Sequence, residues 1–343
     1  MTARHGISAA GNWIIDRIKI IDSYPVEGNL ANILSVEPPA NGGAPYNVLL
    51  DLAKLKADIP LQAIGALGDD DNAEFIISDC QRHGVECSQL KRKAGLPTSF
   101  TDVMNVTSSG HRTFFHARGA NAALDITDFD PAKISGRILL LGYLLLLDRL
   151  DHEDSEYGTR AARLLALLSA EGIETAVDVV SENSDRFSKI VIPALPHTDY
   201  LIVNEIEAGK TVGRSIRDKA GKLQRNLLNE AGIALLEKGV RKRVIIHFPE
   251  ASLSLKRNGA NIENIYQPSL KLPSGYIKGA TGAGDAFCAG CLYGIHEGWE
   301  TPRMLLFASA MAAACLSHPT SSQGIRPLPE ILKLLDLYPQ NEA

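Results

Sequence analysis

The segment KGATGAGDAFCAG, residues 278–290, places three glycines and two alanines within six positions, just before a lone carboxylate, Asp285. A strand-like stretch precedes this turn, and the helix-like run DAFCAGCLYGIHEG follows it. Glycines let backbone N–H groups point at one spot, and a helix N-terminus adds partial positive charge there. We therefore predict that Gly282, Ala283 and Gly284 form an anion hole suited to phosphate. Asp285 is then placed to take a proton from a hydroxyl that attacks this phosphate.

Two plainer interpretations of the segment stay open on these residues alone. In the first, Gly282 and Gly284 merely permit a tight turn, and Asp285 is the N-cap of the helix. In the second, GATGAG is a dinucleotide-binding fingerprint, which belongs to a β-α-β unit with an acidic residue about 20 positions further on. Little chain follows the segment, which argues against the fingerprint.

Strand-like and helix-like runs alternate along most of the chain. The run ISAAGNWII, residues 7–15, is expected to be a first strand, and NVLLDLAKLKA, from Asn47, has the apolar spacing of a helix. PLQAIGALG, RILLLGYLLLL, ETAVDVV, DYLIVNE and KRVIIHF are further expected strands, and NAEFIISDCQRHG and EYGTRAARLLALLSAEG are expected helices. Repeated β-α-β units predict an α/β fold with a mostly parallel central sheet and helices on both faces.

Two segments, about 17–40 and 98–118, break this rhythm. The first alternates in polarity and carries turn residues but has no helical period. The second is typical of a hairpin with Ser108, Ser109 and Gly110 at its turn. We predict that the two segments form a small β-sheet lid over one edge of the main sheet. The lid is then an insertion in one α/β domain that spans residues 1–343.

Composition argues against several classes of partner. The formal net charge of −5 disfavours nucleic acid and anionic membranes. The N-terminus lacks the apolar core of a secretory signal, and the apolar run 138–147 is half the length of about 20 residues that a membrane-spanning helix needs. Five irregularly spaced cysteines do not suggest a disulfide framework, so the CxxC of Cys288 and Cys291 is interpreted as packed thiols. The expectation is a soluble, cytoplasmic protein.

Three further motifs carry candidate site residues. In VNEIEAG, Asn204 and Glu207 are three positions apart, which places both side chains on one face of a helical turn, where they suit Mg²⁺-bound water near a phosphate. ANGGAPYN is a second glycine turn before a helix, where a small polar ligand can approach the backbone and Asn47 can hydrogen-bond it. Asp16 ends the expected first strand, where ligand-binding residues of α/β sheets lie.

These motifs together resemble the ribokinase-like, PfkB-type carbohydrate kinase family, in the family's order and over nearly the whole chain. GGAPYN resembles its N-terminal G-G-x-x-x-N signature, RGANAAL its G-A-N segment and VNEIE its N-x-x-E motif. TGAGDAF matches the C-terminal signature, which is the most specific of the set. The resemblance implies a ribokinase-like three-layer sandwich, with a lid that closes over the sugar and often pairs two subunits into a homodimer.

The resemblance also implies an activity and a set of roles. The family uses ATP and Mg²⁺ to phosphorylate a hydroxyl of a small sugar or related compound, here a sugar or sugar acid. Asp285 matches the catalytic base, and Gly282, Ala283 and Gly284 match the anion hole. The implied nucleotide or phosphate positions are Asn204, Glu207, Thr281 and His247, of which Asn204 and Glu207 would hold Mg²⁺ through water. The implied substrate positions are Asp16, Gly42, Gly43, Asn47 and Arg118.

The sequence departs from the family pattern in two places. Gly279 and Ala280 stand where the C-terminal signature usually has D-T, and the missing Asp often helps to hold a monovalent cation, which argues against potassium activation. HFPEAS, residues 247–252, stands where many members have T-L-G-x-x-G, and Pro249 lacks an N–H donor. This change predicts either an altered affinity for the nucleotide or a donor other than ATP.

The acceptor is left open by the sequence. Arg118 could read a carboxylate or phosphate of the substrate, or it could pair with a nearby acidic side chain. A nucleoside kinase of the same fold is one alternative. A catalytically weak protein that binds a sugar or nucleotide and reports it to a partner is another, although Asp285, the anion-hole glycines and N-x-x-E argue against it.

Overall fold

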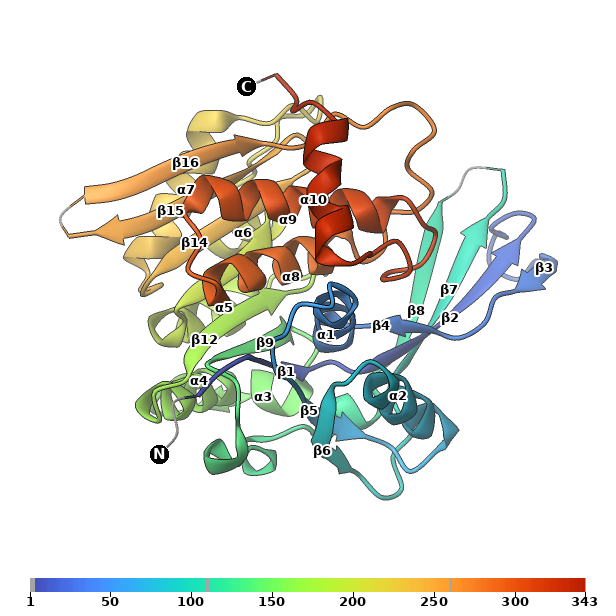
Figure 1. Ribbon diagram of the computed structural model, residues 1–343. Helices are drawn as coiled ribbons and strands as arrows, with labels where there is room; N and C mark the ends of the chain where they lie inside the picture. Colours follow the sequence, from blue (N-terminus) through green and yellow to red (C-terminus); the bar gives the residue numbers. More distant parts are fainter. Residues whose placement is uncertain (1–3, 109–110, 260, 343) are drawn as a thin grey trace.

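The computed structural model describes residues 4–108, 111–259 and 261–342. Within them, a nine-stranded sheet with strand order β16-β15-β14-β13-β12-β9-β1-β5-β6 forms the centre (Figure 1). From β14 to β6 neighbouring strands are parallel, whereas β15 and β16 add an antiparallel hairpin at one edge. The predicted mostly parallel sheet is therefore confirmed. Its strands are β1 (Ile7–Gly11), β5 (Leu61–Leu67), β6 (Glu86–Arg92), β9 (Ile138–Leu144), β12 (Glu174–Val179), β13 (Tyr200–Asn204), β14 (Arg243–Phe248), β15 (Ala251–Asn258) and β16 (Asn261–Pro268).

Helices cover both faces of this sheet, because side chains alternate between the faces along each strand. Ile7 and Ala9 of β1 join one buried hydrophobic cluster, and Ala10 joins the other. The first face carries α1 (Ala44–Lys54), α2 (Asp71–Arg82), α8 (Ala283–His296), α9 (Thr301–Leu316) and α10 (Leu328–Leu337). The second face carries α4 (Arg160–Ala170), α5 (Phe187–Ala194), α6 (Glu205–Val212) and α7 (Arg225–Glu237). The predicted three-layer sandwich is confirmed. In the part of the chain that the structure describes, no helix has the length and apolarity to cross a membrane.

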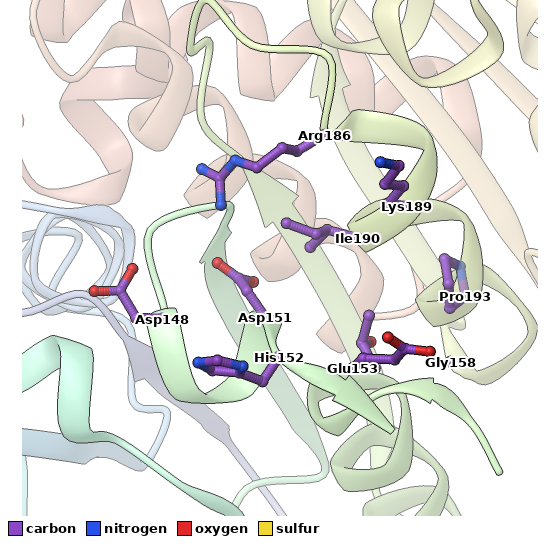
Figure 2. A pocket seen from close by; sticks show the side chains of 10 residues that line it. Asp148, Asp151, His152, Glu153, Gly158, Arg186, Lys189, Ile190 and Pro193 are labelled. Atoms are coloured by element: carbon purple, nitrogen blue, oxygen red, sulfur yellow. The ribbon is translucent and has the colours of Figure 1, made fainter. Parts of the chain in front are cut away.

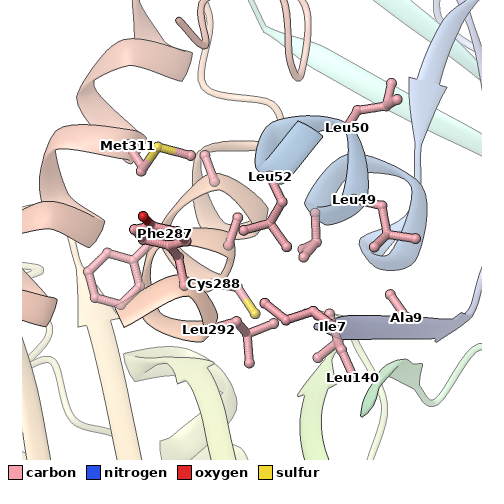
Figure 3. Packing of buried hydrophobic residues seen from close by; sticks show 14 of the residues in the cluster. Ile7, Ala9, Leu49, Leu50, Leu52, Leu140, Phe287, Cys288, Leu292 and Met311 are labelled. Carbon is pink, nitrogen blue, oxygen red and sulfur yellow. The ribbon is translucent and has the colours of Figure 1, made fainter. Parts of the chain in front are cut away.

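The core of the first face anchors the helix that follows the glycine-rich turn. In Figure 3, Ile7 and Leu140 of the sheet lie beside Cys288 and Leu292 of α8. All four side chains are buried, and burial of each of the three aliphatic ones contributes about 1.5–3 kcal/mol. The position of α8, and so of its N-terminus, is fixed by this packing. Cys288 and Cys291 are buried free thiols, as the sequence predicts.

A separate, smaller sheet projects from one side of the main sheet (Figure 1). Its strands are β2 (Ile14–Ile21), β3 (Ile33–Val36), β4 (Ala40–Gly42), β7 (Phe100–Val106) and β8 (Arg112–Ala117). The expected second sheet is confirmed, and β7 and β8 pair as the expected antiparallel hairpin. Ser109 and Gly110 of the predicted turn lie outside the described residues. The further division into one kinase domain with an inserted lid stays a prediction. We call the smaller sheet the lid.

The first strand is shorter than predicted, and the difference moves Asp16 into the lid. β1 ends at Gly11, whose φ is 126° and whose missing Cβ would lie 1.9 Å from the carbonyl oxygen of Gly142. The chain leaves the main sheet there, and β2 begins at Ile14 as a lid strand. Trp13, between them, is fully buried and donates from Nε1 to the carbonyl of Ile64 at 2.8 Å. The prediction of one strand over 7–15 was wrong, because apolar sequence alone does not show this close approach.

Candidate active site

Asp285 lies in the first turn of α8, and it is not the N-cap. The N-cap is Gly282, in the left-handed conformation with φ of 81°. The Asp285 carboxylate is 5 % exposed and accepts two hydrogen bonds, from the Tyr143 hydroxyl at 2.6 Å and from Asn47 Nδ2 at 2.7 Å. The interpretation of Asp285 as a simple cap is therefore wrong, and its carboxylate is held in place from two other elements.

The surroundings of Asp285 tune its basicity. Burial raises the pKa of its carboxyl, while the hydrogen bonds from Tyr143 and Asn47 lower it, and the balance is a raised pKa. A raised pKa brings a carboxylate nearer to the value that suits a general base at neutral pH. The contacts of Asp285 therefore suit proton abstraction.

At the glycine-rich turn, backbone N–H groups at the start of α8 receive no hydrogen bond from a capping side chain. Within the described residues, Gly282 makes no side-chain cap for α8. The Ala283 N–H bonds back to the carbonyl of Ala280 at 3.4 Å, so it is occupied by the turn itself. The N–H groups of Gly284 and Asp285 belong to the first turn, which has no acceptors inside the helix. They are the donors that an anion at this helix end would meet.

A second glycine turn presents Asn47 to Asp285. The N-cap of α1 is Gly43, with φ of 84° and, among the described residues, no side-chain cap. A Cβ at Gly43 would lie 2.0 Å from the carbonyl oxygen of Asn12, so only glycine fits. Asn41 Nδ2 donates to Asn47 Oδ1 at 2.6 Å, and this contact turns the Asn47 amide so that Nδ2 faces Asp285. The G-G-x-x-x-N pattern thus has a geometric reason here.

Asp16 reaches the same place from the lid. Its carboxylate packs against Gly42, where a Cβ would lie 2.6 Å from Oδ1. Burial, and then the charge of Asp285, raise the pKa of Asp16 to about 7, whereas Arg112 acts to lower it. Asp16, Gly42, Asn47 and Asp285 are therefore gathered at one site, although Asp16 lies in the lid and not in the main sheet.

A cavity of about 620 Å³ opens on the other side of the glycine-rich turn. Ala283 and Gly284 form the end of it that adjoins the anion hole, and Asn204 and His247 also line it. Apolar side chains make up much of the remaining wall, including Leu270, Leu272, Ile277, Phe287 and Leu316. The size and the apolar lining suit a planar ligand such as a nucleotide base, with its phosphates at the turn.

Asn204 and Glu207 form a reciprocal capping box at the start of α6. The Glu207 N–H donates to Asn204 Oδ1 at 2.8 Å, and the Asn204 N–H donates to Glu207 Oε2 at 2.9 Å. Ser181 donates to the other Glu207 oxygen at 2.7 Å and accepts from Asn204 Nδ2. Burial, the largest cause, raises the pKa of Glu207 to about 7. The predicted common face is confirmed, and both side chains are held rigidly.

The residues of this site fit Mg²⁺ only as partners of its bound waters, and not as direct ligands. Burial raises the pKa of Asp178 well above its usual range, and the charges of Glu207 and Asp285 raise it further. Such gathered carboxylates are stabilised by a nearby cation. In the described residues, however, no group of three or more acidic, His or Cys side chains lies close enough to hold a metal ion directly. Mg²⁺ commonly keeps several waters and takes its other ligands from substrate phosphates, so it would meet Glu207 and Asn204 through water.

His247 and Thr281 lie at opposite sides of the turn. The His247 ring packs on Phe287 with centroids 5.0 Å apart, and a Cβ at Gly284 would lie 3.2 Å from its Cε1. Burial lowers the pKa of His247 to about 4, so the imidazole is neutral and can offer a hydrogen bond but no charge. The hydroxyl of Thr281 accepts a hydrogen bond from Nη1 of Arg112, a lid residue.

Arg118 is placed near the site but is engaged by an acid. Its guanidinium pairs with Asp148 at 2.9 Å and donates to the carbonyl of Leu145 at 3.2 Å, two residues after Tyr143. Asp148 and Arg186 also line a second cavity of about 780 Å³, which Figure 2 shows beside α3 (Asp148–Asp151). That cavity contains none of the predicted site residues and has mixed charges, so we do not assign it to the reaction.

Sequence reasoning missed Tyr143 and Arg112. Tyr143 stands in the run ILLLGYLLLL, whose apolar pattern predicts a strand but does not single out its one hydroxyl group. Tyr143 lies near the C-terminal end of β9. Ligands bind at this end of parallel strands, so the position of Tyr143 in the expected strand is a sequence signal for a site residue. Arg112 follows a turn in the lid hairpin, and nothing local indicates that it reaches residue 281.

Comparisons with known proteins identify the family of the chain. A model of the pfkB family carbohydrate kinases matches residues 11–327. The chain is 26% identical over 303 residues to the 5-dehydro-2-deoxygluconokinase of Clostridium perfringens, covering 85% of this chain and 82% of that protein. It is 28% identical over 297 residues to the protein of the same name from Clostridium beijerinckii, covering 83% and 80%. These relatives are kinases by name, which disfavours the non-catalytic sensor.

Solved structures share the fold. A ribokinase from Thermotoga maritima superposes with a TM-score of 0.76 at 20% identity, covering 97% of this chain and 99% of that one. An Arabidopsis thaliana ribokinase complexed with ribose and ATP gives 0.74 at 20% identity, covering 97% and 99%. A nucleoside kinase from Methanocaldococcus jannaschii gives 0.73 at 17% identity, covering 96% and 98%. The ribokinase-like fold is therefore confirmed, and at these identities the likeness concerns the fold alone.

Proposed function

The chain belongs to the pfkB family of carbohydrate kinases, and on that premise we propose that it transfers the γ-phosphoryl group of ATP to a hydroxyl of a small sugar acid. The class of acceptor is supported by the two relatives named 5-dehydro-2-deoxygluconokinase, which are 26% and 28% identical to this chain. ATP as phosphoryl donor, Mg²⁺ as cofactor and a cytoplasmic location are parts of the same proposal.

The observation that carries the proposal is the buried Asp285 carboxylate between two kinds of space. On one side lies the cavity of about 620 Å³ whose wall suits a nucleotide, and on the other lie Asp16 and the lid. The N-terminus of α8 stands at the boundary. An acceptor hydroxyl held by Asp16 and Asn47 would meet Asp285 there, with the γ-phosphate at the helix end.

The chemical step follows from this placement. Asp285 takes the proton of the acceptor hydroxyl as its oxygen forms a bond to the γ-phosphorus. The bond between the γ-phosphorus and the oxygen that bridges it to the β-phosphate breaks, and ADP leaves with that oxygen. The amides of Gly284 and Asp285 would offset charge on the transferring group. Mg²⁺, when bound with the nucleotide, would neutralise the phosphates, and Glu207 and Asn204 would orient its waters.

Arg118 is the residue that we propose to read the carboxylate of a sugar acid. Arginine can donate to a carboxylate in a two-pronged geometry, and Arg118 already pairs with one carboxylate, that of Asp148, through Nη1. Both side chains are partly exposed, at 32% and 44%, so a substrate carboxylate can replace Asp148 at little desolvation cost. The position next to the loop after Tyr143 is consistent with a ligand that also reaches Asp285.

A coupled assay of ADP release tests the proposal. The acceptors are 5-dehydro-2-deoxygluconate, a neutral sugar of similar size, ribose and adenosine, each with Mg·ATP, and Asp285→Asn is the inactive control. We expect the sugar acid to have the highest kcat/KM. Arg118→Met should raise KM for the acid, while KM for the neutral sugar stays within about twofold, because only the acid has the carboxylate.

Three other outcomes of this assay would each contradict a part of the proposal. If adenosine is the preferred acceptor, the chain is a nucleoside kinase and the sugar-acid proposal is wrong. If the neutral sugar equals the acid, and Arg118→Met affects both alike, the carboxylate reader is wrong. If ADP release with every acceptor equals that of Asp285→Asn, the kinase proposal itself fails.

The lid supports a further part of the proposal, a homodimer formed by two lids. Strand β3 is an edge strand of the lid, and all four of its residues are exposed. Large apolar side chains exposed on the lid are Tyr24, Val26, Leu30, Ile33, Leu34, Val36, Phe114 and Phe115. An exposed apolar patch of this kind marks an interaction site, and a second lid would cover it. Light scattering with Leu34→Glu tests this, since the variant should be monomeric if the parent is a dimer.

A further inference from the structure

The segment 338–342 follows α10 and returns beside the end of β16 (Figure 1). The N–H of Lys271 donates to the carbonyl of Pro339 at 2.7 Å. Further along, the N–H of Asn341 donates to the carbonyl of Ser269 at 2.8 Å. Between these two contacts the two stretches form an antiparallel bridge. The segment is therefore held in an extended course beside residues that line the cavity of about 620 Å³.

Asn341 is the residue of this segment that lines the cavity. Its Nδ2 lies 3.5 Å from the carbonyl oxygen of Glu250, which also accepts from the N–H of Ser269 at 3.1 Å. Because a carbonyl oxygen can only accept, the NH₂ end of the Asn341 amide is the end that faces Glu250. In the part of the chain that the structure describes, Asn341 Oδ1 meets no donor. The amide thus keeps an acceptor, and the second proton of Nδ2, for a ligand.

Other polar side chains of the cavity are taken up by protein contacts. Glu205 pairs with Arg217 at 2.8 Å. Ser309 Oγ accepts from the N–H of Leu270 at 3.2 Å. Leu270 belongs to the apolar wall and bridges to the segment that carries Asn341. The free amide therefore lies where the flat part of a bound nucleotide would pack, away from the phosphates at the glycine-rich turn.

The turn that departs from the family pattern lies next to this amide. Phe248 pairs with Ala251 across the hairpin of β14 and β15. The two residues between them, Pro249 and Glu250, form the turn. Phe248 and Pro249 line the cavity, and a proline has no N–H to offer a ligand. The amide of Asn341, which contacts Glu250, places a donor and an acceptor beside a turn that lacks this donor.

The amide has the hydrogen-bonding pattern of one purine edge. Adenine presents an NH₂ donor at N6 beside an acceptor at N7, and an asparagine amide can pair with both at once. Guanine presents two acceptors, O6 and N7, at the same edge. Because Glu250 holds the NH₂ end of Asn341, Oδ1 cannot turn away from a guanine O6 unless the contact with Glu250 is lost.

We propose that Asn341 is a specificity-determining residue for the phosphoryl donor, whose amide reads the N6 edge of adenine and selects adenine over guanine nucleotides. This inference rests on the proposed kinase function, since it concerns the nucleotide that supplies the phosphoryl group. Asn341 exchanges no proton in the reaction, because the transferred group lies at the other end of the cavity. The segment after α10 is then a part of the nucleotide site.

Nucleotide binding tests this without any acceptor. Calorimetric titrations with Mg·ADP and with Mg·GDP compare the parent, Asn341→Ala, Asn341→Asp and Gln340→Ala. Gln340 is the matched control, since it lies on the same segment outside the cavity wall and accepts a hydrogen bond from Gln267 at 2.8 Å. We expect the parent to bind ADP at least about tenfold more tightly than GDP. Asn341→Ala should weaken ADP binding about tenfold and change GDP binding less than about twofold.

The aspartate variant separates recognition from packing. Asn341→Asp keeps the size of the side chain but has no donor for N7, so it should also weaken ADP binding more than GDP binding. Gln340→Ala should bind both nucleotides as the parent does.

Four results would overturn the inference. These are a parent that binds neither nucleotide, a parent that binds ADP and GDP alike, an equal weakening of both in Asn341→Ala, and the same loss of ADP affinity in Gln340→Ala. Failure of the proposed function is a separate result. A parent that prefers ADP in the titrations, but releases no ADP with any acceptor, defeats the kinase proposal, while the loss of that preference in Asn341→Ala still supports the role of Asn341.

Discussion

Replacing Asp285 by asparagine removes the proposed base while changing the site least. The two side chains have the same shape, and the carboxylate of Asp285 accepts hydrogen bonds from Tyr143 and Asn47, at 2.6 and 2.7 Å. An asparagine oxygen can keep one of these donors, and the Tyr143 hydroxyl can turn to accept from the new amide. Burial is the main cause that raises the pKa of Asp285, so a neutral side chain relieves that penalty. We expect the free energy of unfolding to change by about 1 kcal/mol or less.

The effect on turnover should be much larger. General base catalysis contributes about 10²–10⁴-fold to a rate, which corresponds to about 3–5 kcal/mol of activation free energy. Loss of the base should therefore lower kcat by that factor. The acceptor KM should change little, because Asp16, Asn47 and the lid still bind the acceptor. Coupled ADP release measures kcat and KM, and urea unfolding measures stability on the same preparations.

Two outcomes would refute the reasoning. A variant that keeps the parent kcat with the preferred acceptor would show that another group takes the proton. A variant whose activity and free energy of unfolding fall together would show that Asp285 holds the site together and that its chemistry was not tested. Asn47→Ala is the control, since it removes one partner of the carboxylate and leaves the base in place.

Three more perturbations have defined outcomes. Tyr143→Phe removes a hydrogen bond that lowers the pKa of Asp285, so the acidic limb of the kcat–pH profile should move to higher pH; an unmoved limb contradicts the role of Tyr143. Gly282→Ala places a Cβ 2.7 Å from Cα of Ser321 at a φ of 81°. A thermal melt should therefore show a loss of stability larger than the about 1–2 kcal/mol that the left-handed conformation costs by itself. The pKa of Asp16 is raised from 3.8 to about 7 by folding, so the folded state holds a proton that the unfolded state has already lost between about pH 4 and pH 7. Stability from this group therefore falls as pH rises across that window, and urea unfolding should show a shallower fall between about pH 4 and pH 7 in Asp16→Asn.

The parts of the site that depend on near neighbours could be predicted from the sequence. Asn204 and Glu207 are three positions apart, and a helical turn puts them together wherever the helix lies. The glycine-rich turn and Asp285 likewise belong to one short segment, so the anion-binding helix end was visible from spacing and residue type. The two faces of the sheet follow from the alternation of apolar residues.

The parts that depend on distant contacts could not be predicted. Tyr143 and Asp285 are 142 positions apart, and they meet only because strand β9 and helix α8 pack at the same end of the sheet. The end of β1 at Gly11 depends on the carbonyl of Gly142 in a neighbouring strand, so the apolar run alone suggested a longer strand. The same is true of Arg112, whose partner Thr281 lies in another layer.

The two glycine N-caps have a consequence for how the protein survives without its ligands. Helices α1 and α8 both begin at a glycine with positive φ, Gly43 and Gly282, and within the described residues neither glycine supplies a side-chain cap. A serine or aspartate at the N-cap typically adds only about a few tenths of a kcal/mol over glycine, and both helices forgo that side-chain hydrogen bond. On the proposed function, anions and hydroxyls of the substrates would accept hydrogen bonds from these N–H groups and so complete the two helix ends. The N–H groups at these two helix ends should therefore exchange with solvent faster in the resting protein than with the ligands bound, although the packed helices themselves stay in place.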